Sequence, residues 1–381
     1  MIEINGAIGG GSVLRLASGL AIATNQAIRV VNIRQQRRKP GLQAQHRAGL
    51  RAAAAYCDGR LAGDEIGSIQ IEFEPGASRR ERLDIQIETA GAVGLALQPL
   101  LIATLTAPHP LTLAIQGGAT FGLWAPPSPY VDRVLAPMLE RFGRRLSLRV
   151  DRHGFYPQGG ARTSVKLAAD DAAPRWIAFS ERDSAAAQQP SCPEAAIHQT
   201  FTGQQAALTP SSPAGGRGGV VIEERGRLLR VKGVSIAANH LEKARVALRQ
   251  AQAATDKLLA ELRGVRVDIR PDYADTRSPG SGIVLWAEFE HTVLGASALG
   301  ALGKRSEAVG EEAADALLEE IRADGTVDRH MADQLIPVVA LLGGKFRAPA
   351  MTEHVEVNLA VVRQILGERL RVDDRWISRI T

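Results

Sequence analysis

Arg152-His-Gly-Phe-Tyr-Pro-Gln-Gly-Gly160 is a glycine-rich loop that joins two expected strands, Leu146–Asp151 and Thr163–Leu167. Glycine and proline are the strongest local breakers of regular structure, so this segment predicts a strand pair. A helix is expected immediately before the pair, over Tyr130–Phe142. The sequence around the loop therefore indicates strand pairs that alternate with helices.

The same alternation extends to the N-terminus. The expected strands are Ile2–Ile4, Ala27–Ile33, Ser68–Phe73, Leu83–Glu88 and Leu111–Gln116, and the expected helices are Val13–Ala23, 42–56 and Val93–Thr106. Strand pairs and helices recur at intervals of several tens of residues. This spacing favours an α+β fold with α/β repeats over one doubly wound sheet, although no sequence repeat is visible.

The character of the chain changes near Ala169. Residues 180–219 are rich in Ser, Ala, Gln, Pro and Gly, which is typical of a mobile loop or a linker. We expect a small insert domain over 177–279, with a low-complexity loop at about 181–219. The main domain then comprises residues 1–176 and 280–381, and strand pairing resumes in it over 283–296.

Composition limits the class of protein. The 381 residues are 45% hydrophobic and 23% charged, an ordinary globular balance with enough length for two domains. The two cysteines, Cys57 and Cys192, exclude a disulfide framework and a Cys-based zinc site. The N-terminus lacks a signal-peptide pattern, and no apolar run approaches the roughly 20 residues of a membrane span. We expect a cytoplasmic protein without membrane contact.

Basic residues dominate the N-terminal region. No acidic residue lies between Glu3 and Asp58, and the interval holds Arg15, Arg29, Arg34, Arg37, Arg38, Lys39, Arg47 and Arg51. A region of one sign indicates phosphate binding, and arginine suits bidentate phosphate contacts. A solvated basic surface is the alternative. The turn Gly9-Gly10-Gly11-Ser12 before a helix fits either a phosphate cradle or a tight turn without a ligand.

Two C-terminal helices carry polar residues of interest. Met351-Thr-Glu-His-Val-Glu-Val-Asn-Leu-Ala-Val-Val-Arg-Gln-Ile-Leu366 reads as a helix capped by Thr352, with His354 in its first turn and Asn358 one turn later. The positive end of the helix dipole disfavours a charged imidazole, which suits a nucleophile or base, although a surface histidine beside a cap is the simpler explanation. An apolar helix over Val327–Gly343 carries Asp333 and Gln334, and Pro337 predicts a kink or a restart within it.

Four motifs occur in order along the chain. They are Ile33-Arg34-x-x-Arg37-x-Lys39-Pro40-Gly41-Leu42-x-x-Gln45-His46, Arg152-His153-Gly154-Phe155-Tyr156-Pro157-x-Gly159-Gly160, Ala332-Asp333-Gln334-Leu335 and His354-x-x-x-Asn358-x-Ala360-Val361-Val362. Together they resemble the RNA 3′-terminal phosphate cyclase family, over roughly residues 1–170 and 283–375. The resemblance implies a large domain of three repeated βαβαββ units, similar to the C-terminal domain of translation initiation factor three, with a small α+β insert domain.

The resemblance also implies an activity. Enzymes of this family are ligases that use ATP and a divalent metal, Mg or Mn, to convert an RNA 3′-phosphate into a 2′,3′-cyclic phosphate. The implied path is a covalent histidine–AMP, then an RNA 3′-phosphate-adenylate, then displacement of AMP by the 2′-hydroxyl. The expected partners are RNA with a 3′-phosphate end and ATP, with a homodimer left open.

By motif, His354 corresponds to the nucleophile and Asp333 to a carboxylate associated with the metal. The residues that correspond to the ATP, phosphate and RNA-end pocket are Arg15, Arg34, Arg37, Gln45, His46, Gln98, Pro127, Tyr130, Gln334 and Asn358.

The chain departs from the family pattern in its glycine turn. The family turn Gly-x-Gly-Glu-Gly-Gly-Gly-Gln-Ile-Leu-Arg contains a glutamate, whereas Gly6-Ala-Ile-Gly9-Gly10-Gly11-Ser12-Val13-Leu14-Arg15 is shorter and has none. Asn5 replaces a usual Asp, Ala161 replaces a third Gly, and His330 lies near a position that is often Tyr. Two alternatives therefore stay open: a non-catalytic or weakly active RNA-binding protein in RNA processing, and a transferase acting on small phosphorylated metabolites.

Overall fold

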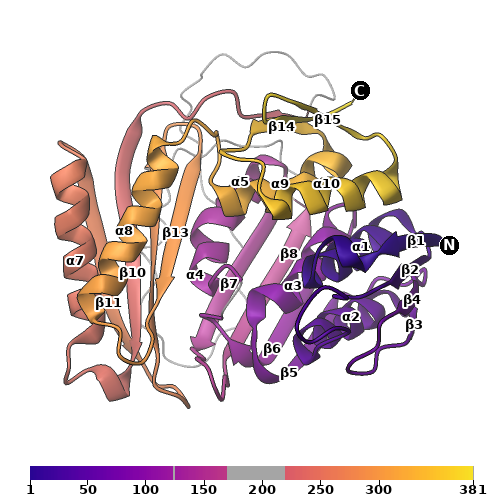
Figure 1. Cartoon of the computed structure of the whole chain (residues 1–381), viewed down its shortest axis with the longest axis horizontal. Helices are drawn as coiled ribbons and strands as arrows, with labels where there is room; N and C mark the ends of the chain where they lie inside the picture. Colours follow the sequence, from indigo (N-terminus) through magenta and orange to yellow (C-terminus); the bar gives the residue numbers. More distant parts are fainter. Residues whose placement is uncertain (123–124, 170–218, 381) are drawn as a thin grey trace, which may run out of the picture. The chain divides into compact units, whose positions relative to one another are not determined.

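The computed structural model describes residues 1–122, 125–169 and 219–380. The segment expected at 181–219 lies, apart from Gly219, outside these residues. Helices and strands are mixed throughout, in agreement with the expected α+β class (Figure 1). None of the helices in the described ranges combines the length and apolarity needed to cross a membrane.

The N-terminal sheet has the strand order β1-β2-β4-β3. Its strands are β1 (Ile2–Asn5), β2 (Ile28–Val31), β3 (Arg60–Ala62) and β4 (Ile71–Glu74). β1 and β2 are parallel, and β4 is antiparallel to both β2 and β3. Helix α1 (Gly11–Thr24) connects β1 to β2 after a short 3-10 turn (Gly6–Ile8), and α2 (Ala44–Cys57) connects β2 to β3. These connections place the N-termini of both helices after the first two strands.

A second sheet repeats this pairing, with the order β5-β6-β8-β7. Its strands are β5 (Arg82–Ala92), β6 (Leu111–Ala119), β7 (Arg144–Arg152) and β8 (Arg162–Ala169). Again the first two strands are parallel, and the fourth is antiparallel to the second and third. Helix α3 (Val93–Thr104) follows β5, and α4 (Ser128–Tyr130), a π-helical turn (Val131–Leu135) and α5 (Ala136–Arg141) form one continuous segment after β6.

A third sheet of the same pattern is built from the C-terminal region and one strand far from it in sequence. Its order is β15-β16-β14-β9, with β9 (Val220–Val221) parallel to β14 (Gly344–Arg347). β16 (Trp376–Arg379) is antiparallel to β14 and to β15 (Leu370–Asp373). Helices α9 (Arg329–Leu342) and α10 (Glu353–Leu366) flank β14 in sequence, and both pack against each other.

The fourth sheet lies between β9 and α9 in sequence. It contains β10 (Leu228–Ala238), β11 (Arg266–Ala274), β12 (Ser281–Phe289) and β13 (Val293–Leu299), in the order β11-β10-β12-β13. A 3-10 turn (Asn239–Leu241) and α7 (Val246–Glu261) follow β10, and α8 (Ser306–Arg322) follows β13. β12 pairs with β10 from Ser281 to Phe289, so the boundary expected between residues 279 and 280 falls inside this sheet.

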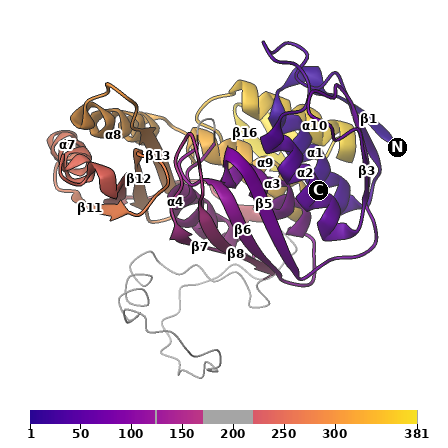
Figure 2. The ribbon, with the colours of Figure 1, turned by 90° about the horizontal axis from the view of Figure 1, so that it is seen from below.

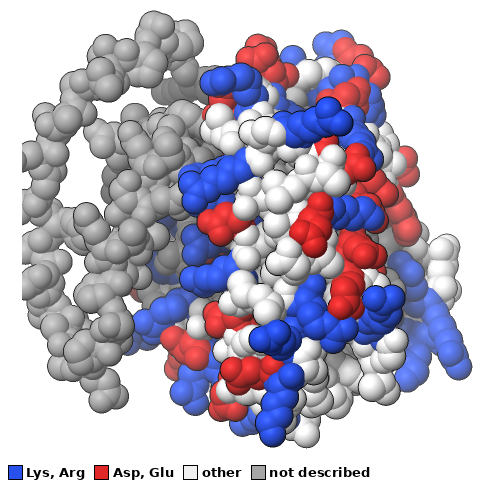
Figure 3. Space-filling view, turned by 90° about the vertical axis from the view of Figure 1, so that its left-hand side faces the viewer, with Lys and Arg blue, Asp and Glu red and all other residues white. Residues whose placement is uncertain are grey.

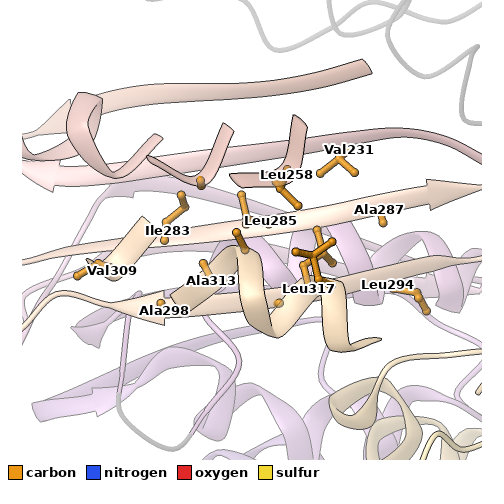
Figure 4. Packing of buried hydrophobic residues seen from close by; sticks show 14 of the residues in the cluster. Val231, Leu258, Ile283, Leu285, Ala287, Leu294, Ala298, Val309, Ala313 and Leu317 are labelled. Atoms are coloured by element: carbon orange, nitrogen blue, oxygen red, sulfur yellow. The ribbon is translucent and has the colours of Figure 1, made fainter. Parts of the chain in front are cut away.

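The core of the fourth sheet explains why β12 belongs to it. Side chains of β12 such as Ile283 and Leu285 point toward α7 and α8, where Leu258, Ala313 and Leu317 meet them (Figure 4). Burying this apolar layer provides the main favourable free energy for docking the helices on the strands.

The outer surface of the two helices carries charges of both signs (Figure 3). Three ion pairs join α7 to α8, Arg249–Glu307, Lys257–Asp315 and Arg322–Glu261. Since the charges are paired across the helices, this surface is unlike the one-signed region expected for nucleic-acid contact.

Candidate active site

The candidate site forms where the first turns of α1 and α10 approach α9. Both α1 and α9 pack against α10, which Figure 1 shows as neighbouring helices. The close approach involves glycine: a Cβ on Gly9 would lie 2.5 Å from Val357 Cγ1 of α10. Residues from the two ends of the chain are therefore adjacent.

His354 is the second residue of α10 and its side chain is exposed. The helix begins as the sequence predicts, because Thr352 accepts a hydrogen bond from the Val355 backbone N–H at 3.2 Å. An exposed imidazole in the first turn of a capped helix is open to a ligand bound at that end.

The glycine turn forms the N-terminus of α1. Gly10 is the N-cap residue and makes no side-chain cap hydrogen bond, and the first turn contains no acidic residue. The backbone N–H groups of a first helical turn lack helical partners, and the helix dipole favours an anion there. This 14-residue helix therefore presents donors to a phosphate group, beside the arginines described below.

His46, in the first turn of α2, lies against the start of α1. A Cβ on Gly11 would overlap its ring, at 2.6 Å from Cδ2. The side chain is only 4% exposed, and Nδ1 has no hydrogen-bond partner among the described residues. Burial, followed by the charges of Arg15 and Arg34, lowers the pKa of His46 to about 3. The ring is therefore neutral at physiological pH, and it meets Gly11 through Nε2, Cδ2 and Cε1, while the unpaired Nδ1 is buried.

Gln45 lies beside the end of β5, whereas Arg37 of the loop before α2 lies over the glycine turn. The Cβ of Gln45 lies 3.1 Å from the position that a Cβ on Gly91 would take. Arg37 lies over Gly10 and forms an ion pair with Glu353 at 3.9 Å, next to His354 in sequence. Arg34 donates from Nη1 to the carbonyls of Lys39 (2.8 Å) and Gly41 (3.1 Å), so it also shapes its own loop.

A relay of side chains connects α1 to α9 through α3. Arg15 donates from Nε to Gln98 Oε1 at 2.7 Å, and Gln98 donates to Gln334 Oε1 at 3.4 Å. Gln334 in turn donates to Asp333 Oδ1 at 2.8 Å. Burial lowers the pKa of Arg15 to about 10, and Asp333 opposes the shift. Arg15 therefore remains a cation. Its orientation is fixed through Nε, and the two terminal nitrogens of its guanidinium take no part in that hydrogen bond.

Asp333 is the carboxylate of this group. Burial raises its pKa to about 6, against the hydrogen bond from Gln334 and the electrostatic interactions with His330, His354 and Arg15. The electrostatic influence of His354 and Arg15 on Asp333 shows that all three belong to one cluster.

Asn358 is buried between the two helices and its Nδ2 donates to the Asp333 carbonyl at 2.9 Å. It therefore connects the helix of His354 to the helix of Asp333.

Tyr130 and Pro127 were expected in the ligand pocket by their correspondence with the family. Both are buried, and Tyr130, with 1% exposure, donates its hydroxyl to Asp328 Oδ1 at 2.8 Å. Asp328 is the N-cap of α9 and also accepts from the backbone of His330, Met331 and Gly295, each at 2.9 Å. A buried carboxylate requires such donors, and this explains why the Tyr130 hydroxyl points inward.

His330, one of the departures from the family pattern, also lies in the site, although it was not among the expected site residues. It is exposed, one turn before Asp333 on α9, and its ring meets Tyr130 edge-on at 6.2 Å. Spacing of three residues from Asp333 is the signal that would have identified it, because such residues share a helix face.

The glycines of the loop that follows β7 allow the loop to pack closely against neighbouring backbone. Cβ atoms on Gly154 and Gly159 would lie 2.5 and 2.7 Å from the Gly118 carbonyl oxygen. Thr120 Oγ1 and His153 Nδ1 are hydrogen-bonded at 2.9 Å. These contacts require residues without side chains at the two glycines and hold the loop against the end of β6.

The residues present fit a divalent metal that arrives with phosphate ligands. No group of three or more His, Cys, Asp or Glu side chains in the described residues is arranged to hold a metal. Mg²⁺, however, commonly takes one or two carboxylates and completes its shell with phosphates and water. Asp333, among cations that would also attract phosphate, matches that requirement.

Comparison with known proteins agrees with the geometry. A model of the RNA 3′-terminal phosphate cyclase family matches residues 7–372. Three relatives carry the name RNA 3′-terminal phosphate cyclase. The protein of Hyperthermus butylicus is 37% identical over 375 residues, covering 96% of this chain and 92% of its own. That of Methanothermobacter thermautotrophicus is 35% identical, covering 98% and 96%, and that of Archaeoglobus fulgidus is 34% identical, covering 99% of both.

Proposed function

This chain belongs to the RNA 3′-terminal phosphate cyclase family, and we propose that it converts an RNA 3′-terminal phosphate into a 2′,3′-cyclic phosphodiester using ATP. One observation carries the proposal. The exposed His354 lies on a helix that packs against both the glycine turn of α1 and the helix of Asp333. A nucleophile, an anion cradle and a carboxylate are thus adjacent, as nucleotidyl transfer requires.

In the first step, an imidazole nitrogen of His354 attacks the α-phosphorus of ATP. An N–P bond forms, the P–O bond to pyrophosphate breaks, and His354 carries AMP. The amides at Gly10 and Gly11 and the cations Arg15 and Arg37 stabilise the negative charge that develops on the phosphates. A bound Mg or Mn ion would add charge neutralisation at the phosphates, and Asp333 is the residue that would hold it.

In the second step, an oxygen of the RNA 3′-phosphate attacks the phosphorus of AMP and the N–P bond breaks. In the third, the adjacent 2′-hydroxyl attacks the 3′-phosphorus, loses its proton to solvent, and AMP leaves. We assign the RNA end to the region of Arg34, Arg37, Gln45 and His46, where the neutral His46 ring lies against the start of α1. Gln98 and Gln334 orient Arg15 and Asp333, while Asn358 acts between helices.

We also propose a domain organisation. The three sheets with the same pairing correspond to three βαβαββ units, the third being interrupted after β9. The insert then comprises residues 228–322, the fourth sheet with α7 and α8. A cytoplasmic location is the one in which ATP and processed RNA would both be available.

The test uses an RNA oligonucleotide that carries a labelled 3′-phosphate. After incubation with the protein, ATP and Mg²⁺, the ends should resist alkaline phosphatase, and a His354→Ala variant should leave them sensitive. An oligonucleotide with a 3′-hydroxyl is the control for end specificity. Ends that stay sensitive with the wild-type protein would overturn the proposed activity.

A second candidate function is RNA binding without catalysis. The observation that favours it is the glycine turn over Gly6–Gly11, which has no acidic residue, whereas the family pattern has a glutamate there. In that case the same oligonucleotide would bind the wild-type protein and the His354→Ala variant equally, and its end would remain sensitive to phosphatase in both mixtures.

A further inference from the structure

Helix α9 runs through Pro337 without a break. Proline has no backbone N–H, so the carbonyl four residues earlier, that of Asp333, loses its helical donor. A side chain from the neighbouring helix takes this place, since Asn358 Nδ2 donates to the Asp333 carbonyl at 2.9 Å. Helices α9 and α10, which are neighbours in Figure 1, are therefore joined through an acceptor that the proline leaves free.

Asn358 is buried, which indicates that this hydrogen bond is the reason for a polar amide at this position. The side chain is 3% exposed, and its Oδ1 has no hydrogen-bond partner in the described part of the chain. A buried amide with one unpaired atom is costly, whereas an apolar side chain of similar size is not.

The bond controls which way α10 faces. Asn358 follows His354 by four residues, and Pro337 follows Asp333 by four, so each pair shares one face of its helix. Fixing Asn358 to α9 at the level of Asp333 fixes the rotation of α10 about its own axis. His354 is then directed to the side on which Asp333 lies.

We propose that Pro337 and Asn358 form a positioning pair that holds the His354 imidazole toward Asp333 for the attack on ATP. The pair takes no part in bond making. This inference rests on the proposed function, in which His354 is the nucleophile. It predicts that restoring a regular helix at residue 337 makes the protein no less stable but a poorer catalyst.

The primary variant is Pro337→Ala. The new N–H competes with Asn358 for the Asp333 carbonyl and weakens the bond to α10. Single-turnover transfer of AMP from saturating ATP to the protein should slow roughly 10- to 100-fold, because a displacement of ~1 Å at a reacting group can cost ~100-fold. The midpoint of thermal unfolding should be unchanged or higher. A wild-type rate in this variant would overturn the proposal.

A double variant and a matched control sharpen the result. Asn358→Leu should slow the transfer by itself, and adding it to Pro337→Ala should cost little more, because the two residues act through one bond. Fully additive losses would contradict the pairing. Pro99→Ala, also inside a helix, is the control: no side chain of the described residues donates to the Leu95 carbonyl that Pro99 leaves free, and its rate should stay unchanged.

Amide hydrogen exchange separates failure of this inference from failure of the proposed function. In Pro337→Ala, the first turns of α10 should exchange faster than in the wild type, whether or not the protein is an enzyme. If the wild type never acquires AMP, the proposed function fails, and faster exchange still confirms the bond between the helices. Unchanged exchange in α10 would refute the positioning pair.

Discussion

The imidazole of His46 lies against the backbone of Gly11, so closely that a Cβ on the glycine would come within 2.6 Å of ring atom Cδ2. Gly11 begins α1, and His46 lies in the first turn of α2. The contact brings the starts of two helices together and excludes a side chain at the point where a phosphate would meet the helix amides.

Gly11→Ala is expected to displace His46 and to weaken ATP binding. The backbone of Gly11 is not in the left-handed region, so alanine itself suits the helix and the loss comes from overlap with the ring. The measurement is the dissociation constant for ATP. Gly49→Ala, inside α2, is the control, because a Cβ there would meet its nearest atoms at 3.5 Å. Equal affinities in the two variants would refute the phosphate cradle.

Arg15→Lys is expected to slow AMP transfer although it keeps the positive charge. Lysine cannot donate from an Nε to Gln98 and still present a planar fork to phosphate, so the loss should be about 10-fold or more. Arg29→Lys, on β2 beside Glu72, is the control and should retain the wild-type rate. Full activity of Arg15→Lys would show that only its charge matters.

Tyr130→Phe is expected to lower the free energy of unfolding by roughly 1.5–3 kcal/mol, the usual value for a hydrogen bond to a charged group. The ring remains, and only the bond to Asp328 is lost. Chemical denaturation measures the difference. Tyr56→Phe supplies the comparison, because Tyr56 is also 1% exposed but its ring lies beside a cation, the Arg79 guanidinium. Similar stability of both variants would contradict the role given to Tyr130.

The buried His153 imidazole is expected to make the folded protein less stable as the pH falls. Burial lowers its pKa to about 4, with Asp272 opposing, so the unfolded chain takes up the proton first as pH falls. Its contribution is complete above a pH of about 6.5 and is lost as pH decreases toward 4. Thermal unfolding at about pH 7.5 and about pH 5 should show a smaller difference for His153→Gln than for the wild type. The opposite order would contradict the assignment.

The sequence predicted where strands occur better than it predicted which strands pair with each other. Strand pairing over 283–296 was expected in the main domain, but the pairing of β12 with β10 was not, because the register between distant strands leaves no local signal in the sequence. β12 is buried along its whole length, covered by helices on one side and approached by Phe121 near Gly282 on the other. Its apolar run is therefore compatible with either domain.

Pro337 and Tyr130 show why parts of the site escaped sequence reasoning. A proline predicts a kink or a restart, yet α9 continues because a side chain 21 residues later in the chain replaces the missing contact. Tyr130 was expected at a ligand, but a buried carboxylate 198 residues away takes its hydroxyl. His354, Asp333 and Arg15, which sequence comparison singled out, interact electrostatically in the structure, and their catalytic roles stay predictions.

The most direct test is to locate the AMP that the protein carries. Incubation with α-labelled ATP and Mg²⁺, followed by peptide mapping, should find label on the peptide that contains His354, labile in acid and stable in base. His354→Ala should carry none, whereas His330→Ala should still be labelled at His354. Label that persists in His354→Ala, or that maps to another residue, would contradict the proposed mechanism.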